Sequence, residues 1–230
     1  TIDQFVVIEP DTLSKPRYHS EVKVFYTEEG LYIGTLNEQP SDTLLARLTS
    51  RDTYINRDGV SLTLDTSGTG LYGLWFGINL GGSLVDGTVL PERNYSSDWN
   101  GPWKGNSYIT EDGYTTEMFL PWSMMSMPES DKERVMGIYF SRKVAYLDER
   151  WSFPALPPTG SRLMSALQPI EMADVQPRPQ IAVFPFTSVS YDNLAKNGDE
   201  QGYEIGADIF WRPSTDLQLT ATINPDFGAV

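Results

Sequence analysis

Hydrophobic and polar residues alternate with a period of two along most of the chain, a pattern that predicts β-strands. Residues 113–120 are the clearest example: Tyr114, Thr116, Met118 and Leu120 fall on one side, with Thr115, Glu117 and Phe119 on the other. Further strand-like runs, separated by turn residues, occupy 5–8, 21–26, 31–36, 60–64, 71–80, 83–89, 107–109 and 135–144. About nine short strands of this kind predict an all-β fold, an antiparallel β-sandwich of the jelly-roll or immunoglobulin-like type.

Helical signals are few. Residues 41–48 predict one short helix or turn, and residues 122–127 predict a single turn. Glu117 stands out in its strand because a carboxylate among residues built for burial must find hydrogen-bond donors. We therefore expect Glu117 to hold a neighbouring loop or to form part of a polar site.

The composition changes between residues 153 and 179, where repeated prolines interrupt any strand ladder. This stretch predicts the exit from a first domain. Three more strands are expected at 180–191, 203–211 and 217–223, and in the last of them Leu217, Leu219, Ala221 and Ile223 alternate with polar residues. Such strands suit either an ordinary antiparallel extension or the first strands of an outer-membrane barrel, which are apolar outside and polar inside. The pattern alone leaves both open.

Charge and composition exclude some classes of binding partner and some kinds of site. The formal net charge of −14 repels phosphate backbones, so we expect no nucleic-acid partner. The sequence has no cysteine, which excludes disulfides, thiolate metal sites and thiol nucleophiles. Because it begins at Thr1 rather than methionine, we expect a processed or truncated piece of a longer protein.

Six tryptophans are the first candidates for a binding role, because the C–H face of a sugar stacks on a flat ring. Trp99 and Trp103 lie in a polar stretch, 95–104, and Trp151 lies at a predicted strand end. The alternative is that the loop folds back and its indoles cover the sandwich. Trp75, in a run that is apolar on both faces, is predicted to be a core residue.

Arginine and acidic residues allow polar contacts to a ligand or within the protein. Arg51 and Arg142 suit either role, and an internal ion pair with a carboxylate such as Glu117 or Asp65 is favoured. Single acids such as Asp98, scattered in turns, define no metal-ligand set, although a structural calcium ion stays open. His19 is the only histidine, and no catalytic motif accompanies it, so no enzyme activity is predicted. Glycoside hydrolysis needs only two carboxylates at a suitable distance, which a sequence does not report, and no local motif here supports such a pair.

The segment from Gly113 to Trp122, GYTTEMFLPW, resembles the signature strand of family 9 carbohydrate-binding-module-like (DOMON-like) domains. Asn224 begins an NPDFG element similar to one in a bacterial family in which such a domain precedes an outer-membrane β-barrel region. Motifs at 21–26, 30–34, 51–52, 64–66, 137–142 and Trp151 occur in the same order as in that family.

This resemblance implies a sandwich at 1–170, and at 171–230 a proline-rich linker with the first strands of a barrel-like region. It further implies a non-catalytic carbohydrate-binding domain of a bacterial cell envelope, associated with the outer membrane on its periplasmic or extracellular side. Its partners would be an oligo- or polysaccharide and the barrel region of the same chain, and association with polysaccharide catabolism would follow only by analogy. The alternative is a soluble cap or plug of an outer-membrane barrel without sugar affinity. The candidate carbohydrate-binding residues are Trp99, Trp103, Trp151, Arg51 and Asp98.

Overall fold

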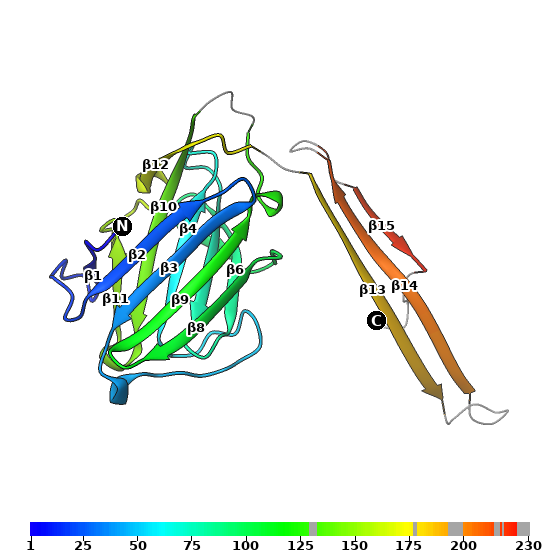
Figure 1. Ribbon diagram of the computed structural model, residues 1–230, viewed down its shortest axis with the longest axis horizontal. Coiled ribbons are helices and arrows are strands. Elements are labelled where there is room, and N and C mark those ends of the chain that lie inside the picture. The colour runs from blue at the N-terminus through cyan, green and yellow to red at the C-terminus, as the bar shows by residue number, and fades with distance from the viewer. Residues whose placement is uncertain (129–132, 177–178, 193–199, 214–216, 218, 225–230) are drawn as a thin grey trace. The chain divides into compact units, whose positions relative to one another are not determined.

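The computed structural model describes residues 1–128, 133–176, 179–192, 200–213, 217 and 219–224. The chain divides into two compact units, Thr1–Gln176 and Pro177–Val230, each of which is described by itself (Figure 1). The first unit extends beyond the expected end at residue 170 because the strand Gln168–Ala173 (β12) pairs with Glu133–Val144 (β10).

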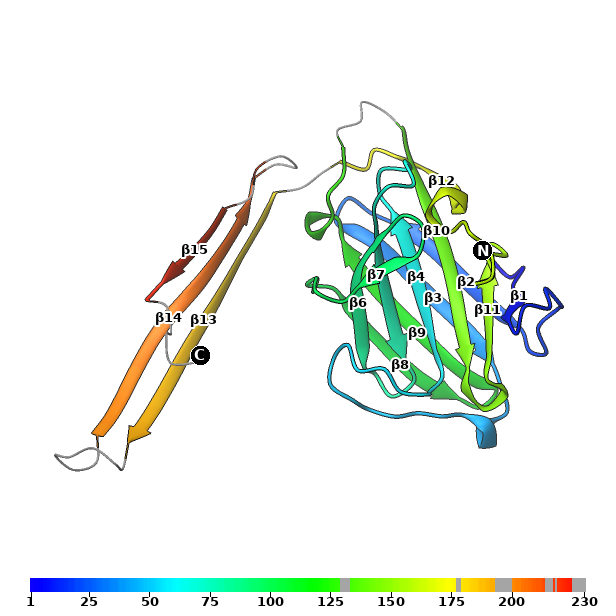
Figure 2. The ribbon, with the colours of Figure 1, turned by 180° about the vertical axis from the view of Figure 1, so that it is seen from behind.

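The first unit consists of two antiparallel sheets packed face to face (Figures 1 and 2). The large sheet has the order β1 (Val6–Glu9), β11 (Glu149–Phe153), β10, β4 (Gly59–Asp65), β5 (Gly73–Asn79), β6 (Leu84–Leu90), β7 (Asn94–Ser96). The small sheet has the order β2 (Ser20–Tyr26), β3 (Gly30–Glu38), β9 (Gly113–Pro121), β8 (Lys104–Thr110). The predicted antiparallel β-sandwich is confirmed.

Helix is limited to four short 3-10 turns among the described residues: η1 (Ser41–Thr43), η2 (Trp122–Met124), η3 (Ala145–Leu147) and η4 (Met164–Ala166). The first two coincide with the turns expected near residues 41 and 122. Within the described residues, no helix has the length and apolar character needed to cross a membrane.

The core lies between the two sheets and follows the period-two pattern. Leu62 and Leu64 of β4 and Leu120 of β9 are fully buried there, as the alternation predicts. The expectation that Glu117 is buried among hydrogen-bond donors is wrong, because its side chain is exposed. Glu117 lines a hollow together with Lys104 and Asn106 of β8. It points away from the core on β9, since the outer face of the small sheet meets solvent at this position.

Arg142 of β10 is a fully buried cation inside the sandwich. Its guanidinium donates to four oxygens, the carbonyl oxygens of His19 and Glu38, Ser20 Oγ and Gln39 Oε1. Its Cζ lies 4.8 Å from the ring centroid of Trp151. The amide nitrogen of Gln39, Nε2, donates to Oδ2 of Asp58, a buried carboxylate, at 3.2 Å. Gln39 therefore links a buried cation to a buried anion.

The second unit is an antiparallel sheet of β13 (Gln180–Asp192), β14 (Glu200–Arg212) and β15 (Leu219–Ile223). The strands lie where the sequence alternation predicts them. Register places Ile181 opposite Trp211 and Trp211 opposite Leu219, so all three share one face, and all three are exposed. The NPDFG element, apart from Asn224, lies outside the described residues.

Candidate functional site

A groove of about 550 Å³ lies on the face of the large sheet that points away from the small sheet. Its floor is built from the residues of β4, β5 and β10 that alternate with the core side chains. The small ones, which are mostly polar, are Gly59, Ser61, Thr63, Gly77 and Ser141, and the large ones are Trp75, Tyr139 and Lys143. Ser61 Oγ and Ser141 Oγ are 2.8 Å apart and hydrogen bonded. The small floor residues give the groove depth, and their hydroxyls face its interior.

Three aromatic rings form one wall of this groove. Trp75 of β5 lies between Tyr54 and Tyr95, with centroid distances of 6.2 Å and 5.9 Å. Trp75 itself is only 8% exposed, whereas Tyr54 is 65% exposed and Tyr95 is 45% exposed. The tilted and edge-on packing is the favoured geometry for aromatic pairs. The two phenol rings are thus the open surfaces, and the indole supports them.

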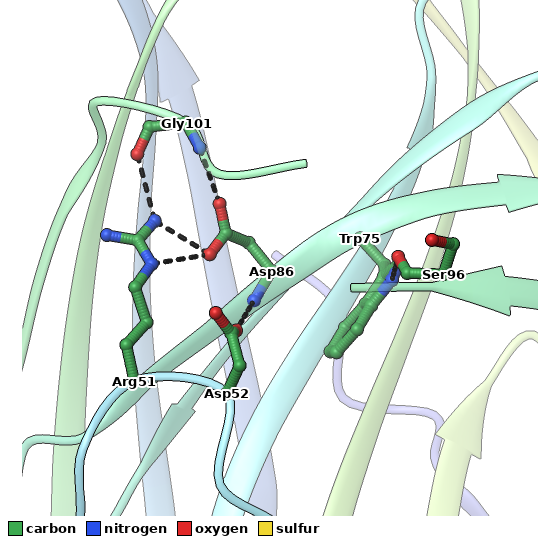
Figure 3. Close-up of polar contacts among 6 residues, drawn as sticks. All are labelled: Arg51, Asp52, Trp75, Asp86, Ser96 and Gly101. Atoms are coloured by element: carbon green, nitrogen blue, oxygen red, sulfur yellow. Dashed lines mark hydrogen bonds and ion pairs between the residues drawn. The ribbon is translucent and has the colours of Figure 1, made fainter. Parts of the chain in front are cut away.

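Trp75 is held by the neighbouring strands β6 and β7. Its indole Nε1 donates to the carbonyl oxygen of Ser96 at 3.3 Å (Figure 3). Gly87, its cross-strand partner on β6, has no side chain to obstruct this contact, since a Cβ there would collide with the Ser96 carbonyl and lie 2.7 Å from the indole nitrogen. The position of Tyr95, next to Ser96, follows from this contact.

Tyr54 is carried by the loop of residues 44–58, which a buried carboxylate fixes to β6. Asp86 Oδ1 accepts a hydrogen bond from Arg51 Nε at 2.7 Å and forms an ion pair with Arg51 Nη2, also at 2.7 Å (Figure 3). Asp86 Oδ2 accepts a hydrogen bond from the Gly101 N–H. Asp52 Oδ1 accepts from the Asp86 N–H. Burial raises the pKa of Asp86, and the Gly101 N–H and Arg51 oppose that shift.

Arg51 therefore serves inside the protein. The favoured expectation of an internal ion pair is confirmed for it, with Asp86 as the carboxylate in place of Glu117 or Asp65. Its Nη2 also donates to the carbonyl oxygen of Gly101. Through these contacts Arg51 ties the loop of Tyr54 to the chain after Trp99, and it acts on the groove by positioning.

Charged side chains complete the groove. Four basic residues line it, Arg57, Arg93, Lys143 and Arg150, together with one acidic residue, Glu9. Arg150 Nε donates to Glu9 Oε2 at 3.2 Å. Tyr139 of β10, which also lines the groove, is buried, and this raises the pKa of its hydroxyl to about 12. The groove thus combines ring surfaces, hydroxyls and cations.

The structure brings Trp99 and Trp103 together on Phe76, with Arg51 bonded to Gly101 between them in sequence, whereas Trp151 packs on Arg142. Trp103 and Trp151 are core residues, 4% and 0% exposed, so the structure leaves neither indole face open to a sugar ring. Trp99 packs edge-to-face on Phe76 of β5, with centroids 6.0 Å apart. Asp98 is exposed and accepts a hydrogen bond from Ser96 Oγ. The loop of residues 95–104 folds its indoles inward, as its alternative interpretation proposed.

Sequence reasoning missed the tyrosines that line the groove and the role of Trp75. Trp75 is buried, as predicted, but it belongs to a second apolar cluster, with Val85, Val89 and Tyr139, separate from the core between the sheets. The signal was present in β4, where Ser61 and Thr63 alternate with Leu62 and Leu64. It could not be interpreted because the sequence does not reveal which strands are neighbours.

A metal site is not evident in the described part of the chain, which holds no cluster of three or more histidine or acidic residues with ligand geometry. Asp65, a candidate acid, uses both carboxylate oxygens within its own turn. Oδ1 accepts from the N–H groups of Ser67 and Gly68, and Oδ2 accepts from that of Gly70.

Fold and groove together define the class: an antiparallel β-sandwich with a ring-lined and polar groove on its large sheet. A Bacteroides uniformis protein, provisionally described as carbohydrate-binding, shares this fold with a TM-score of 0.55, 13% identity and coverage of 74% of this chain and 86% of that chain. No protein-family model matches the sequence, and no curated protein matches it.

Two structures of a family 9 carbohydrate-binding module from Caldicellulosiruptor kristjanssonii are also similar, each at 14% identity and covering 72% of this chain. The complex with cellotriose aligns over 78% of its chain with a TM-score of 0.48. The complex with glucose aligns over 80% of its chain with a TM-score of 0.49.

Proposed function

We propose that the sandwich is a non-catalytic carbohydrate-binding domain whose site is the groove on the large sheet. The observation that carries this proposal is the pairing of two open phenol rings, Tyr54 and Tyr95, with a floor of small hydroxyl residues in a groove of about 550 Å³. A sugar ring presents apolar C–H faces and peripheral hydroxyls. The rings suit the former, and Ser61, Thr63 and Ser141 suit the latter.

The contacts that hold the rings of Tyr54 and Tyr95 in place also favour ligand binding. Because Trp75 is fixed by Ser96, and the loop of Tyr54 by Asp86, both phenols are held in place before a ligand arrives. A site ordered in advance loses less conformational entropy on binding. The proposed ligand is an oligosaccharide or the end of a polysaccharide, sized to the groove.

Isothermal titration of the chain with a panel of neutral and acidic oligosaccharides tests this proposal. We expect binding to at least one sugar, and we expect Tyr54→Ala and Tyr95→Ala each to weaken it about tenfold, since one stacked ring contributes roughly 1–1.5 kcal/mol. Tyr108→Ala is the matched control, because Tyr108 is 52% exposed but lies on β8 of the small sheet.

Two results would contradict the proposal. One is the absence of heat with every sugar in the panel. The other is binding that Tyr108→Ala weakens as much as Tyr54→Ala, because the ligand would then lie outside the groove.

We further propose that the second unit belongs to an outer-membrane β-barrel-type region of a bacterial envelope protein, which would place the sandwich in the periplasm or outside the cell. The supporting observation is the shared face of β13, β14 and β15. Its large exposed members are apolar or aromatic: Ile181, Val183, Tyr203, Ile205, Trp211, Leu219 and Ile223. Thr187 is an exposed polar member of this face, and Phe184 is an exposed aromatic residue of the other. Asp208 and Thr222, hydrogen bonded to each other, lie on the opposite face.

Fractionation of the bacterium that makes the natural protein tests this placement, with an antibody against residues 1–176 as the probe. Recovery with the outer membrane is the expected result, and recovery in the cytosol would contradict it. Outer-membrane recovery together with no sugar binding would favour the alternative function, a cap that has no sugar affinity.

A further inference from the structure

The charge of the groove is opposite in sign to that of the chain. The whole sequence carries a formal charge of −14. The groove is lined by the basic residues Arg57, Arg93, Lys143 and Arg150 and by a single acid, Glu9. A cavity of one sign attracts ligands of the other, and a low-dielectric wall strengthens the attraction.

Two of these cations are balanced by carboxylates. Lys143 Nζ lies 2.5 Å from Oδ1 of Asp148, and Arg150 Nε lies 3.2 Å from Glu9 Oε2. The Asp148 side chain is 88% exposed, so water screens much of its charge. Counting both partners, four positive groups meet two negative ones, and the groove keeps a positive excess.

The other two cations have only neutral partners among the described residues. Arg57, 3% exposed, donates to the carbonyl oxygens of Arg47 and Thr53 and to Oγ1 of Thr49. Arg93 donates to four carbonyl oxygens, those of Leu156, Pro157, Gly160 and Arg162. These bonds fix both guanidinium groups in place without cancelling their charge.

Two of the four cations, Arg93 and Arg150, act on the same two tyrosine hydroxyls. Burial raises the pKa of Tyr95 and Tyr139, and the guanidinium groups of Arg93 and Arg150 act in the opposite direction on both hydroxyls. At Tyr54, where burial also raises the pKa, the nearby acids Asp52 and Asp86 raise it further. The charged groups that act on the Tyr95 hydroxyl are thus cations, and those that act on the Tyr54 hydroxyl are carboxylates.

Arg150 is the cation best suited to meet a ligand. Its side chain is 42% exposed. Within the described part of the chain its hydrogen bond to Glu9 uses Nε, which leaves the two terminal nitrogens to point elsewhere. A guanidinium with two free nitrogens matches a planar carboxylate through two parallel hydrogen bonds.

Resting on the proposed sugar-binding function, we propose that the groove selects acidic sugars: oligosaccharides containing a uronic acid, whose carboxylate lies at the Arg93 and Arg150 end while the ring stacks on Tyr95. The negative charge of the rest of the chain opposes the binding of anions there, so we expect acidic sugars to bind only in the groove. Sulfated sugars share the negative charge but lack the planar carboxylate.

Trisaccharides of galacturonic acid and of glucuronic acid, each compared with its methyl ester, test the proposal by isothermal titration of the full chain. Acid and ester share the ring and differ in charge. We expect the acid of at least one pair to bind at least about tenfold more tightly at low salt, with the difference shrinking toward parity in about 1 M NaCl, where the screening length is about 3 Å.

Two variants move the preference in opposite directions. Arg150→Gln should reduce the acid-to-ester ratio to near one, because the acid loses its charged partner and the ester has no charge to lose. Glu9→Gln, which releases Arg150 from its carboxylate partner, should increase the ratio. Lys104→Gln, on β8 of the small sheet, is the charge-matched control and should leave it unchanged.

The outcomes separate this inference from the proposed function. Equal affinity for acid and ester in both pairs overturns the preference while sugar binding stands. Tighter binding of a sulfated trisaccharide than of either uronate overturns the carboxylate assignment. A chain that binds neither these sugars nor any neutral one overturns the proposed function, and the inference fails with it.

Discussion

Replacing Arg142 by methionine tests whether the buried charges of the sandwich depend on one another. Methionine is close in length but carries no charge and no donors. The substitution removes the hydrogen bonds to Ser20 Oγ and Gln39 Oε1, both of which belong to buried side chains. It also leaves Asp58 without the cation that Gln39 connects to it.

The expected cost follows from these losses. Each buried acceptor left without a donor costs about 1–3 kcal/mol, and an uncompensated buried charge costs about 3–5 kcal/mol. Part of this is offset because methionine avoids the desolvation of a guanidinium. We expect Arg142→Met to lower the free energy of unfolding by about 3–5 kcal/mol, a large share of the roughly 5–15 kcal/mol of a typical domain.

Urea unfolding followed by tryptophan fluorescence measures this change, because Trp103, Trp122 and Trp151 are buried in the sandwich. Lys23→Met is the control: Lys23 pairs with Glu21 at the surface, where its side chain is 73% exposed, and its loss should cost less than about 1 kcal/mol. Combining Arg142→Met with Asp58→Asn completes a double-mutant cycle.

The reasoning is refuted if Arg142→Met destabilises no more than Lys23→Met. It is also refuted if the loss of unfolding free energy in the combined variant equals the sum of the losses in the two single variants, because Arg142 and Asp58 would then be energetically independent.

Three further predictions concern the sandwich. Trp151→Ala should lower the free energy of unfolding by about 3–5 kcal/mol in urea, since its indole lies in the core; a loss below 1 kcal/mol would contradict that placement. Burial raises the pKa of both Tyr114 and Tyr139 to about 12, above the unfolded value near 10. Each group therefore stabilises the fold below pH 10, and we expect this contribution of roughly 2–3 kcal/mol to be lost as the pH rises through 12. Unfolding curves at alkaline pH should show a smaller loss for Tyr139→Phe. A chain ending at Gln176 should keep the circular dichroism and urea midpoint of the sandwich, whereas one ending at residue 167 should lose stability because β12 is absent.

The strands were predictable from sequence because burial on one face imposes a period of two. This is why β4 and β9 lie where alternation places them. The tryptophans were harder, because an indole in a polar stretch can turn outward to a ligand or inward to the core. Trp99 and Trp103 turn inward onto Phe76, a residue of β5 that sequence distance does not mark as their neighbour.

The groove depends even more on neighbours that are distant in sequence. Ser61 meets Ser141 across the β4–β10 pair, and Tyr54 reaches Trp75 from a separate loop. Each of these contacts requires the strand order of the large sheet. Local pattern determines which side of a strand is polar, but only topology determines whether several polar sides form one floor.

Asp86 has a consequence for how the loop of residues 44–58, which carries Tyr54 to the groove, moves. A single side chain holds two stretches of chain, one through Arg51 and the other through Gly101. Neither stretch can open alone without breaking a charged bond in a buried setting. The loop of Tyr54 should therefore stay rigid when a ligand binds. We expect fast association and selection of ligands by shape, because no closing step precedes binding.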